Sequence, residues 1–142
     1  MLRSCRAWAR IAFALLGLTA AVSCSSNDGP PVFPVRGKVL VNGKPAAGVT
    51  VSLHQTGEKT LVMNPRGVSA ADGTFQIGYQ TATDGAPAGQ YAVTFVWLPP
   101  RGETDPEEKP DRLKGRFSNP ATAKWKVTVN AGPTELEPFD LK

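Results

Sequence analysis

The stretch Tyr91-Ala-Val-Thr-Phe-Val-Trp-Leu98 decides the fold of this chain. Its aromatic and β-branched side chains at positions 91, 93, 95 and 97 recur with the period of two that places them on one face of a β-strand. The side chains between them are largely apolar as well, so both faces of the strand can be buried. The stretch therefore predicts a central strand of a sheet, with Trp97 on the core face.

Shorter segments with the same alternation lie on both sides of this strand. They span residues 35–41, 49–54, 61–63, 74–79, 124–129 and 136–141. Asn42-Gly43 and Asp72-Gly73 are dipeptides typical of tight turns, and the 13 prolines fall in loops or at strand ends. No segment has a helical period. The pattern predicts an all-β domain over residues 35–142, a seven-stranded antiparallel β-sandwich.

The first 23 residues have the pattern of a signal peptide. Arginines at positions 3, 6 and 10 precede an uncharged run over residues 11–22. As a helix this run would be ~18 Å long, short of the ~30 Å hydrocarbon core, so it fits a signal peptide better than a transmembrane helix.

Ala21-Val-Ser-Cys24 comes next and resembles the lipobox of bacterial lipoproteins, with Ala21 where leucine is usual. The resemblance implies cleavage between Ser23 and Cys24. It also implies diacylglycerol on the Cys24 sulfur and acylation of the new N-terminus, as by palmitate. The alternative is an ordinary secretory signal that is cut near Ala20 or Ser23.

A lipid anchor of this kind defines the expected location and organisation of the chain. Several acyl chains together give stable attachment to a membrane. Residues 24–34 would then be the lipidated cysteine and a Pro-rich tether, which can hold the domain ~25–30 Å from the bilayer. We expect the protein in the cell envelope, facing the periplasm or the exterior, and Ser25 favours the outer membrane. With Cys5 removed and Cys24 lipidated, the domain has no disulfide.

Charge and composition exclude several classes of function. The formal charge is +4, from 16 Lys and Arg against 12 Asp and Glu, and the three arginines of the signal peptide account for most of it. The remaining chain is nearly neutral, and we expect no nucleic-acid partner. One histidine excludes any site that needs two. We also expect no metal and no cofactor.

Several short motifs follow one another along residues 35–142. They are Val35-Arg-Gly-Lys-Val39, Asn42-Gly-Lys-Pro45, Gly48-Val-Thr-Val51, Ala71-Asp-Gly-Thr-Phe75 and Pro87-Ala-Gly-Gln-Tyr-Ala-Val93. Their order resembles the carboxypeptidase regulatory-like, or transthyretin-like, domain, with Ala71 where threonine is usual. Phe117-Ser-Asn-Pro120, the segment 125–129 and Phe139-Asp-Leu141 extend the resemblance to small lipoproteins that are abundant in planctomycete bacteria.

This resemblance implies a seven-stranded, prealbumin-like sandwich with a non-catalytic role. It also implies that Tyr91 is a core aromatic residue, whose hydroxyl group then needs a backbone partner.

Few residues offer catalytic chemistry. His54 is the single imidazole and lies on the polar phase of its segment, so we expect a surface histidine. A Ser-His-Asp hydrolase would have to use it, but no serine lies in a G-x-S-x-G context. Transthyretin-like hydrolases of 5-hydroxyisourate need several histidines and a different C-terminus. We expect no catalytic residues and no enzyme activity.

Residues 99–116 form the longest irregular segment, and it contains the acidic residues Glu103, Asp105, Glu107, Glu108 and Asp111. Mixed charge and several prolines predict a solvated, mobile loop that a short linker could replace. A weak cation site is the alternative. Trp97 and Trp125 follow the core phase, and the alternative for them is an exposed platform that stacks on sugars.

The sequence thus predicts a non-enzymatic, membrane-anchored envelope lipoprotein whose β-sandwich serves binding or structural interaction. The alternative is a carbohydrate- or peptide-binding accessory domain that acts on envelope or extracellular polymers. The expected partners are membrane lipid, through the acylated Cys24, and an envelope protein or glycan. The sequence identifies no ligand-binding residues.

Overall fold

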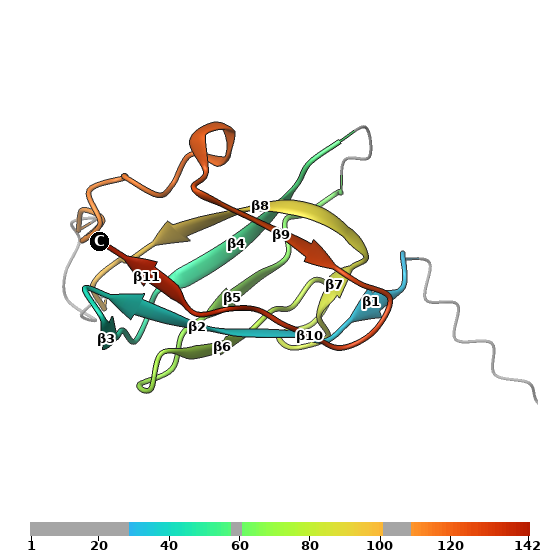
Figure 1. Ribbon diagram of the computed structural model, residues 1–142, viewed down its shortest axis with the longest axis horizontal. Coiled ribbons are helices and arrows are strands. Elements are labelled where there is room, and N and C mark those ends of the chain that lie inside the picture. Colours follow the sequence, from blue (N-terminus) through green and yellow to red (C-terminus); the bar gives the residue numbers. More distant parts are fainter. Residues whose placement is uncertain (1–28, 58–60, 101–108) are drawn as a thin grey trace, which may run out of the picture.

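The computed structural model describes residues 29–57, 61–100 and 109–142 (Figure 1). The signal peptide, Ser23, Cys24 and most of the expected tether lie outside the described residues. Within them the chain forms eleven strands and one 3-10 helix, η1 (Pro120–Thr122), so the predicted all-β class is confirmed. The strands are β1 (Val32–Phe33), β2 (Val35–Val41), β3 (Lys44–Pro45), β4 (Thr50–Gln55), β5 (Arg66–Val68), β6 (Thr74–Gln76), β7 (Ala86–Pro87), β8 (Gly89–Val96), β9 (Trp125–Val129), β10 (Thr134–Glu135) and β11 (Phe139–Leu141).

The predicted central strand is β8, in a four-stranded antiparallel sheet of order β5-β4-β8-β9. Leu53 of β4 and Trp125 of β9 both lie opposite Val93, which fixes the register on each side. Residues 91–95 are buried on both faces of β8. The short strand expected at residues 61–63 is absent there; β5 lies instead at Arg66–Val68, paired with β4.

The second sheet is built around β2 and is mixed, which corrects the expectation of purely antiparallel pairing. β3 and β6 pair with β2 antiparallel, whereas β10 and β11 pair with it in parallel. The predicted last strand at 136–141 is shorter than expected, since β11 begins at Phe139; the separate strand β10 precedes it, and Glu137-Pro138 lies in the break between them. A small third sheet pairs β1 with β7.

One hydrophobic core lies between the two larger sheets (Figure 1). Its fully buried side chains come from alternate positions of the strands and include Val35, Val39, Val51, Leu53, Tyr91, Val93, Phe95 and Leu141. At the β9/β11 edge an aromatic cluster closes the core. Its ring centroids lie 5.2 Å apart for Phe95 and Phe139, 5.4 Å for Phe95 and Trp125, and 5.8 Å for Trp125 and Phe139.

Both predicted tight turns are present. Asn42 and Gly43 have φ values of 50° and 76°, as a type I′ hairpin turn requires. The Gly43 amide also donates to Asp140 Oδ1 over 2.9 Å. At Gly73 the φ is 80°, and a Cβ atom there would lie 2.5 Å from the Val39 carbonyl oxygen. Glycine is therefore required for the close approach of this turn to β2.

The segment after β8 differs from the expected mobile loop. Residues 101–108, with four of the five acidic residues named above, lie outside the described residues. Residues 109–117, in contrast, pack against the end of β8, where β9 no longer pairs with it. The Arg112 amide donates to the Trp97 carbonyl over 2.9 Å, and the Phe95 amide donates to the Phe117 carbonyl over 2.9 Å. Leu113 is 2% exposed, so this half of the loop is part of the core.

A candidate binding depression

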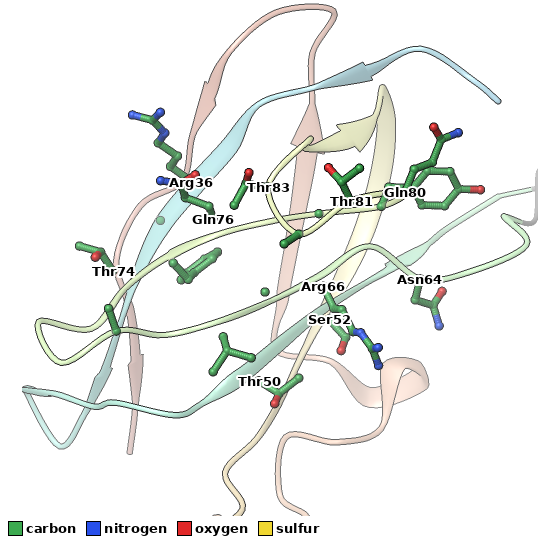
Figure 2. Close-up of a pocket in the computed structure, with 18 of the residues that line it drawn as sticks. Arg36, Thr50, Ser52, Asn64, Arg66, Thr74, Gln76, Gln80, Thr81 and Thr83 are labelled. Atoms are coloured by element: carbon green, nitrogen blue, oxygen red, sulfur yellow. The ribbon is translucent and has the colours of Figure 1, made fainter. Parts of the chain in front are cut away.

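A broad depression lies where the two sheets meet along β5 and β6. It extends from β4 and β5 to β6 and β2, and its volume is about 1370 Å³ (Figure 2). Nearly half of its 20 lining residues have uncharged hydrogen-bonding side chains, among them Thr50, Ser52, Asn64, Thr74, Gln76, Gln80, Thr81 and Thr83. We call this surface the polar depression. Its size suits a polar chain segment rather than a small buried molecule.

Two glycines bring the strands of this surface together. A Cβ atom at Gly67 would overlap the Gln76 carbonyl oxygen, and one at Gly78 would overlap the Thr81 carbonyl oxygen. Between them, Arg66 and Gly78 exchange both backbone hydrogen bonds, of 2.9 and 3.0 Å. The floor of the polar depression is therefore continuous backbone across the two sheets.

The loop at residues 79–84 forms one wall, and Asp84 holds its shape. Its carboxylate accepts hydrogen bonds from the backbone amides of Tyr79, Gln80 and Thr81, over 2.6, 2.9 and 3.0 Å. Partial burial by itself would raise the pKa of Asp84. These three hydrogen bonds outweigh that effect and hold the pKa below its usual value. Asp84 is thus ionised at neutral pH, and the wall is preformed.

Two arginines, Arg36 on β2 and Arg66 on β5, lie at separate positions of the polar depression (Figure 2). Neither forms an ion pair with another described residue. The surface combines uncharged donors and acceptors with the two arginines and with the carboxylate of Glu135, which lies opposite Arg36 in the pairing of β10 with β2. Such a surface can hydrogen-bond to hydroxyl, amide or carboxylate groups of a ligand.

His54 does not lie in this surface. It projects from β4 on the outer face of the four-stranded sheet, half-buried, with Nε2 2.9 Å from Thr94 Oγ1. Burial lowers the pKa of His54, which favours the neutral ring. Thr94 is itself buried, and no carboxylate among the described residues bonds the ring.

The other residues considered from the sequence are separate from the polar depression. Trp97 and Trp125 are half-buried against the core, and Trp97 Nε1 donates to the Ala47 carbonyl over 3.0 Å. Asp111 has a structural role, since its carboxylate accepts from the amides of Trp97, Leu113 and Gly115. Glu103, Asp105, Glu107 and Glu108 lie outside the described residues, as do Ser23 and Cys24.

Tyr91 has the hydrogen bond that the resemblance implied. Its hydroxyl group donates to the Pro87 carbonyl oxygen over 2.7 Å inside the core. Burial, with a smaller contribution from Tyr79, raises the pKa of Tyr91 to about 12. The side chain therefore fixes the turn between β7 and β8 and takes no part in a surface site.

Sequence reasoning missed the polar depression. Its threonine and glutamine side chains occupy either solvent-facing positions of ordinary alternating strands, as at Thr50 and Gln76, or positions of the 79–84 loop, so they carry no local signal. The one available signal was Asp84-Gly85 at the end of the 79–84 loop, which indicates a shaped turn. Which strands meet there depends on long-range pairing between β5 and β6.

Comparison with known proteins adds little to this geometry. No protein-family model and no curated protein matches the chain. A 9R-lipoxygenase from Cyanothece PCC8801 is similar in structure with a TM-score of 0.42 and 13% identity, over 78% of this chain and 16% of that one. The dioxygenase domain of a dioxygenase carbohydrate-binding protein fusion from Streptomyces sp. SirexAA-E is similar with a TM-score of 0.39 and 17% identity. This match covers 83% of this chain and 85% of that one.

The described residues contain no group of three or more His, Cys, Asp or Glu side chains placed to hold a metal ion. No helix within residues 29–57, 61–100 and 109–142 has the length and apolarity to cross a bilayer.

Proposed function

We propose that this protein is a non-enzymatic, lipid-anchored β-sandwich module of the cell envelope that binds a polar partner through the polar depression. The observation that carries the binding role is the depression itself, a surface with many hydrogen-bonding side chains and two arginines that form no ion pair with a described residue. The observation that carries the anchor is Cys24 after an uncharged run and a small residue.

The transthyretin-like, seven-stranded sandwich is part of this proposal. Two packed sheets around one core support it, as do the turns at Asn42-Gly43 and Asp72-Gly73 and the bond from Tyr91 to Pro87. The small strands β1, β3, β7 and β10 would then be additions to the seven-stranded framework.

The anchor would be acylated Cys24, with membrane lipid as its partner and the domain facing the periplasm or the exterior. Ser25 favours the outer membrane. The described chain begins beside β1, at one end of the sandwich (Figure 1). An anchor at this end leaves the polar depression, along the β5/β6 side, accessible to a partner.

The anchor is tested by metabolic labelling with a fatty acid. The Cys24→Ala variant should lose the label and accumulate as uncleaved or soluble protein. The Cys5→Ala variant is a matched control, because it removes the other cysteine of the chain, and it should be labelled like the wild type. Label that persists in Cys24→Ala would refute lipidation at this residue.

A carbohydrate- or peptide-binding accessory role is the alternative, and the polar depression tests it as well. The full-length protein in a non-ionic detergent is screened against glycan and peptide arrays. Any ligand found should bind more weakly after Gln76→Ala and Thr83→Ala, which shorten two lining side chains, than after Thr128→Ala on the exposed strand β9. Equal affinity of all variants would exclude this surface as the site.

A further inference from the structure

Three cations lie over aromatic rings along the side of the sandwich that is away from the polar depression. The Arg112 guanidinium is 5.0 Å from the Trp97 ring centroid, and that of Arg116 is 5.2 Å from Phe117. Lys124 Nζ is 4.8 Å from the Trp125 ring centroid. We call Arg112, Arg116 and Lys124, with the rings beneath them, the cationic ridge. At these distances the rings attract the cations and restrict their positions.

The ridge residues lie near one another through ring contacts, one turn and the pairing of β8 with β9. The Phe117 and Trp125 rings are 5.7 Å apart, and the turn at 111–117 joins Arg112 to Arg116. Trp125 lies opposite Val93, and Val93 precedes Trp97 by four residues. At the rise of a β-strand this separation places Trp97 and Trp125 roughly 13 Å apart along the strand direction, which is the length of the ridge. The charges are therefore spread along a line and do not converge on one point.

Aromatic rings and backbone oxygen atoms contact these cations. Arg116 Nε donates to the Leu113 carbonyl over 3.4 Å, and Arg116 Nη1 donates to the backbone oxygen of Lys142 over 3.2 Å. None of the three ridge cations forms an ion pair with a described residue.

Two carboxylates among the described residues lie near the ridge. Asp111 accepts three backbone amides, and Asp140 accepts the Gly43 amide and lies 3.3 Å from Lys142 Nζ. Neither of these carboxylates forms an ion pair with a ridge cation, although, besides the hydrogen bond from the Gly43 amide, the charge of Lys124 contributes to lowering the pKa of Asp140. The chain after residue 23 is nearly neutral overall, so its composition does not reveal that these three cations lie together on one side.

We propose that the cationic ridge binds an acidic polysaccharide, a chain with carboxylate groups on successive sugars. Repeating negative charge matches cations distributed along a line, and guanidinium groups bond carboxylates in a bidentate manner. Of the ridge cations, Arg112 also borders a shallow, mostly apolar hollow with Pro99 and Pro110, at one end of the line. A polymer with a uniform charged repeat can bind along all three cations and does not depend on that hollow.

The position of the ridge excludes the anchoring membrane as its partner, a step that rests on the proposed lipid anchor. The C-terminus, the turn at 109–117 and the start of β9 lie towards the end of the sandwich opposite β1, where the described chain begins (Figure 1). A domain that is attached through residues 24–34 would direct the ridge away from its own bilayer.

The test measures binding of the full-length protein, in a non-ionic detergent, to polygalacturonate and to its fully methyl-esterified form. The triple variant R112Q/R116Q/K124Q should bind polygalacturonate at least about tenfold more weakly, and added salt should weaken the wild type. The control K38Q/K44Q/K126Q makes the same change of charge outside both the ridge and the polar depression and should change the affinity less than about threefold. If the triple variant unfolds, the single variants R116Q and K124Q replace it, and each should bind polygalacturonate about fivefold more weakly than the wild type.

Several results would overturn the proposal. These are wild-type affinity in the ridge variant, an equal loss in the control variant, or equal binding of the esterified polymer. Binding to polyglutamate, DNA or phosphatidylglycerol vesicles without binding to polygalacturonate would assign the ridge to another class of partner. The Cys24→Ala protein should bind polygalacturonate like the wild type, so failure of the anchor and failure of the ridge are distinguishable.

Discussion

Several single polar side chains fix the local structure of this fold by forming hydrogen bonds with the backbone. Ser69 accepts from the Val49 amide over 2.9 Å and donates to the Ala46 carbonyl over 2.6 Å, while itself buried. Asp84 and Asp111 each accept three amides in the same way. The sequence predicted the partner of Tyr91 only as some backbone group, because distant pairing determines which carbonyl lies in reach.

Removing the Tyr91 hydroxyl should make stability less dependent on pH in the alkaline range. The pKa is about 12 in the folded state and about 10 in the unfolded state. Below pH 10 both states keep the proton, and from pH 10 to 12 only the folded state does, so wild-type stability falls as pH rises through this window.

Chemical denaturation of wild type and Tyr91→Phe from pH 8 to 12 measures this effect. The variant should be less stable by about 1–3 kcal/mol at pH 8, because the Pro87 carbonyl loses its partner. That difference should shrink towards pH 12. A difference that stays constant across the range would show that Tyr91 titrates normally in the folded protein.

At the scale of elements, sequence patterns predicted the positions of the long strands correctly but not those of the short strands. β2, β4, β8 and β9 have clear alternation over five to eight residues. β5 was misplaced because its three residues include Gly67, whose role is a close contact with Gln76 and not side-chain packing. The polar depression follows from that contact, so it could not be predicted either.

The prediction of a mobile loop was wrong for the turn at 109–117, for a different reason. Its charged residues and prolines indicate a solvated loop, and a single leucine carries the contrary signal. Leu113 is buried, and Asp111 satisfies three amides that the turn and the end of β8 leave without partners. Lys114 and Gly115 take positive φ values of 55° and 70°, which the local pattern does not reveal.

Replacing residues 109–116 with a Gly/Ser linker should therefore destabilise the domain strongly. The loss should be at least the ~2–5 kcal/mol of a Leu113→Ala substitution, because the amides bonded to Asp111 also lose their partner. A linker of matched length over residues 101–108 is the control, with an expected change below about 1 kcal/mol. Equal denaturant midpoints for the two replacements would show that the turn contributes no more than its length.

At the scale of the whole molecule, the two long sides of the sandwich are built differently. Along β5 and β6 the sheets join through backbone and leave the polar depression exposed. Along β9 and β11 an aromatic cluster fills the gap and supports cations on its outer surface. Opposite sides can thus serve different partners, while the end that carries β1 leads to the proposed anchor.

The last six residues of the expected tether, 29–34, belong in part to the folded domain. Val32 pairs with Pro87 and Phe33 with Ala86, Phe33 packs against the core, and the Thr134 amide donates to the Pro34 carbonyl over 2.8 Å. All of the buried core residues lie within 35–141.

A fragment of residues 29–142 should therefore unfold at the denaturant midpoint of the full-length protein, since it keeps every described contact. A fragment of residues 35–142 should fold but lose on the order of 2–3 kcal/mol, because Ala86 and Pro87 become exposed and Phe33 no longer packs. Phe33→Ala in the longer fragment separates the side-chain part of this loss from the backbone part. If the two fragments were equally stable, β1 would belong to the tether and the folded domain would begin at residue 35.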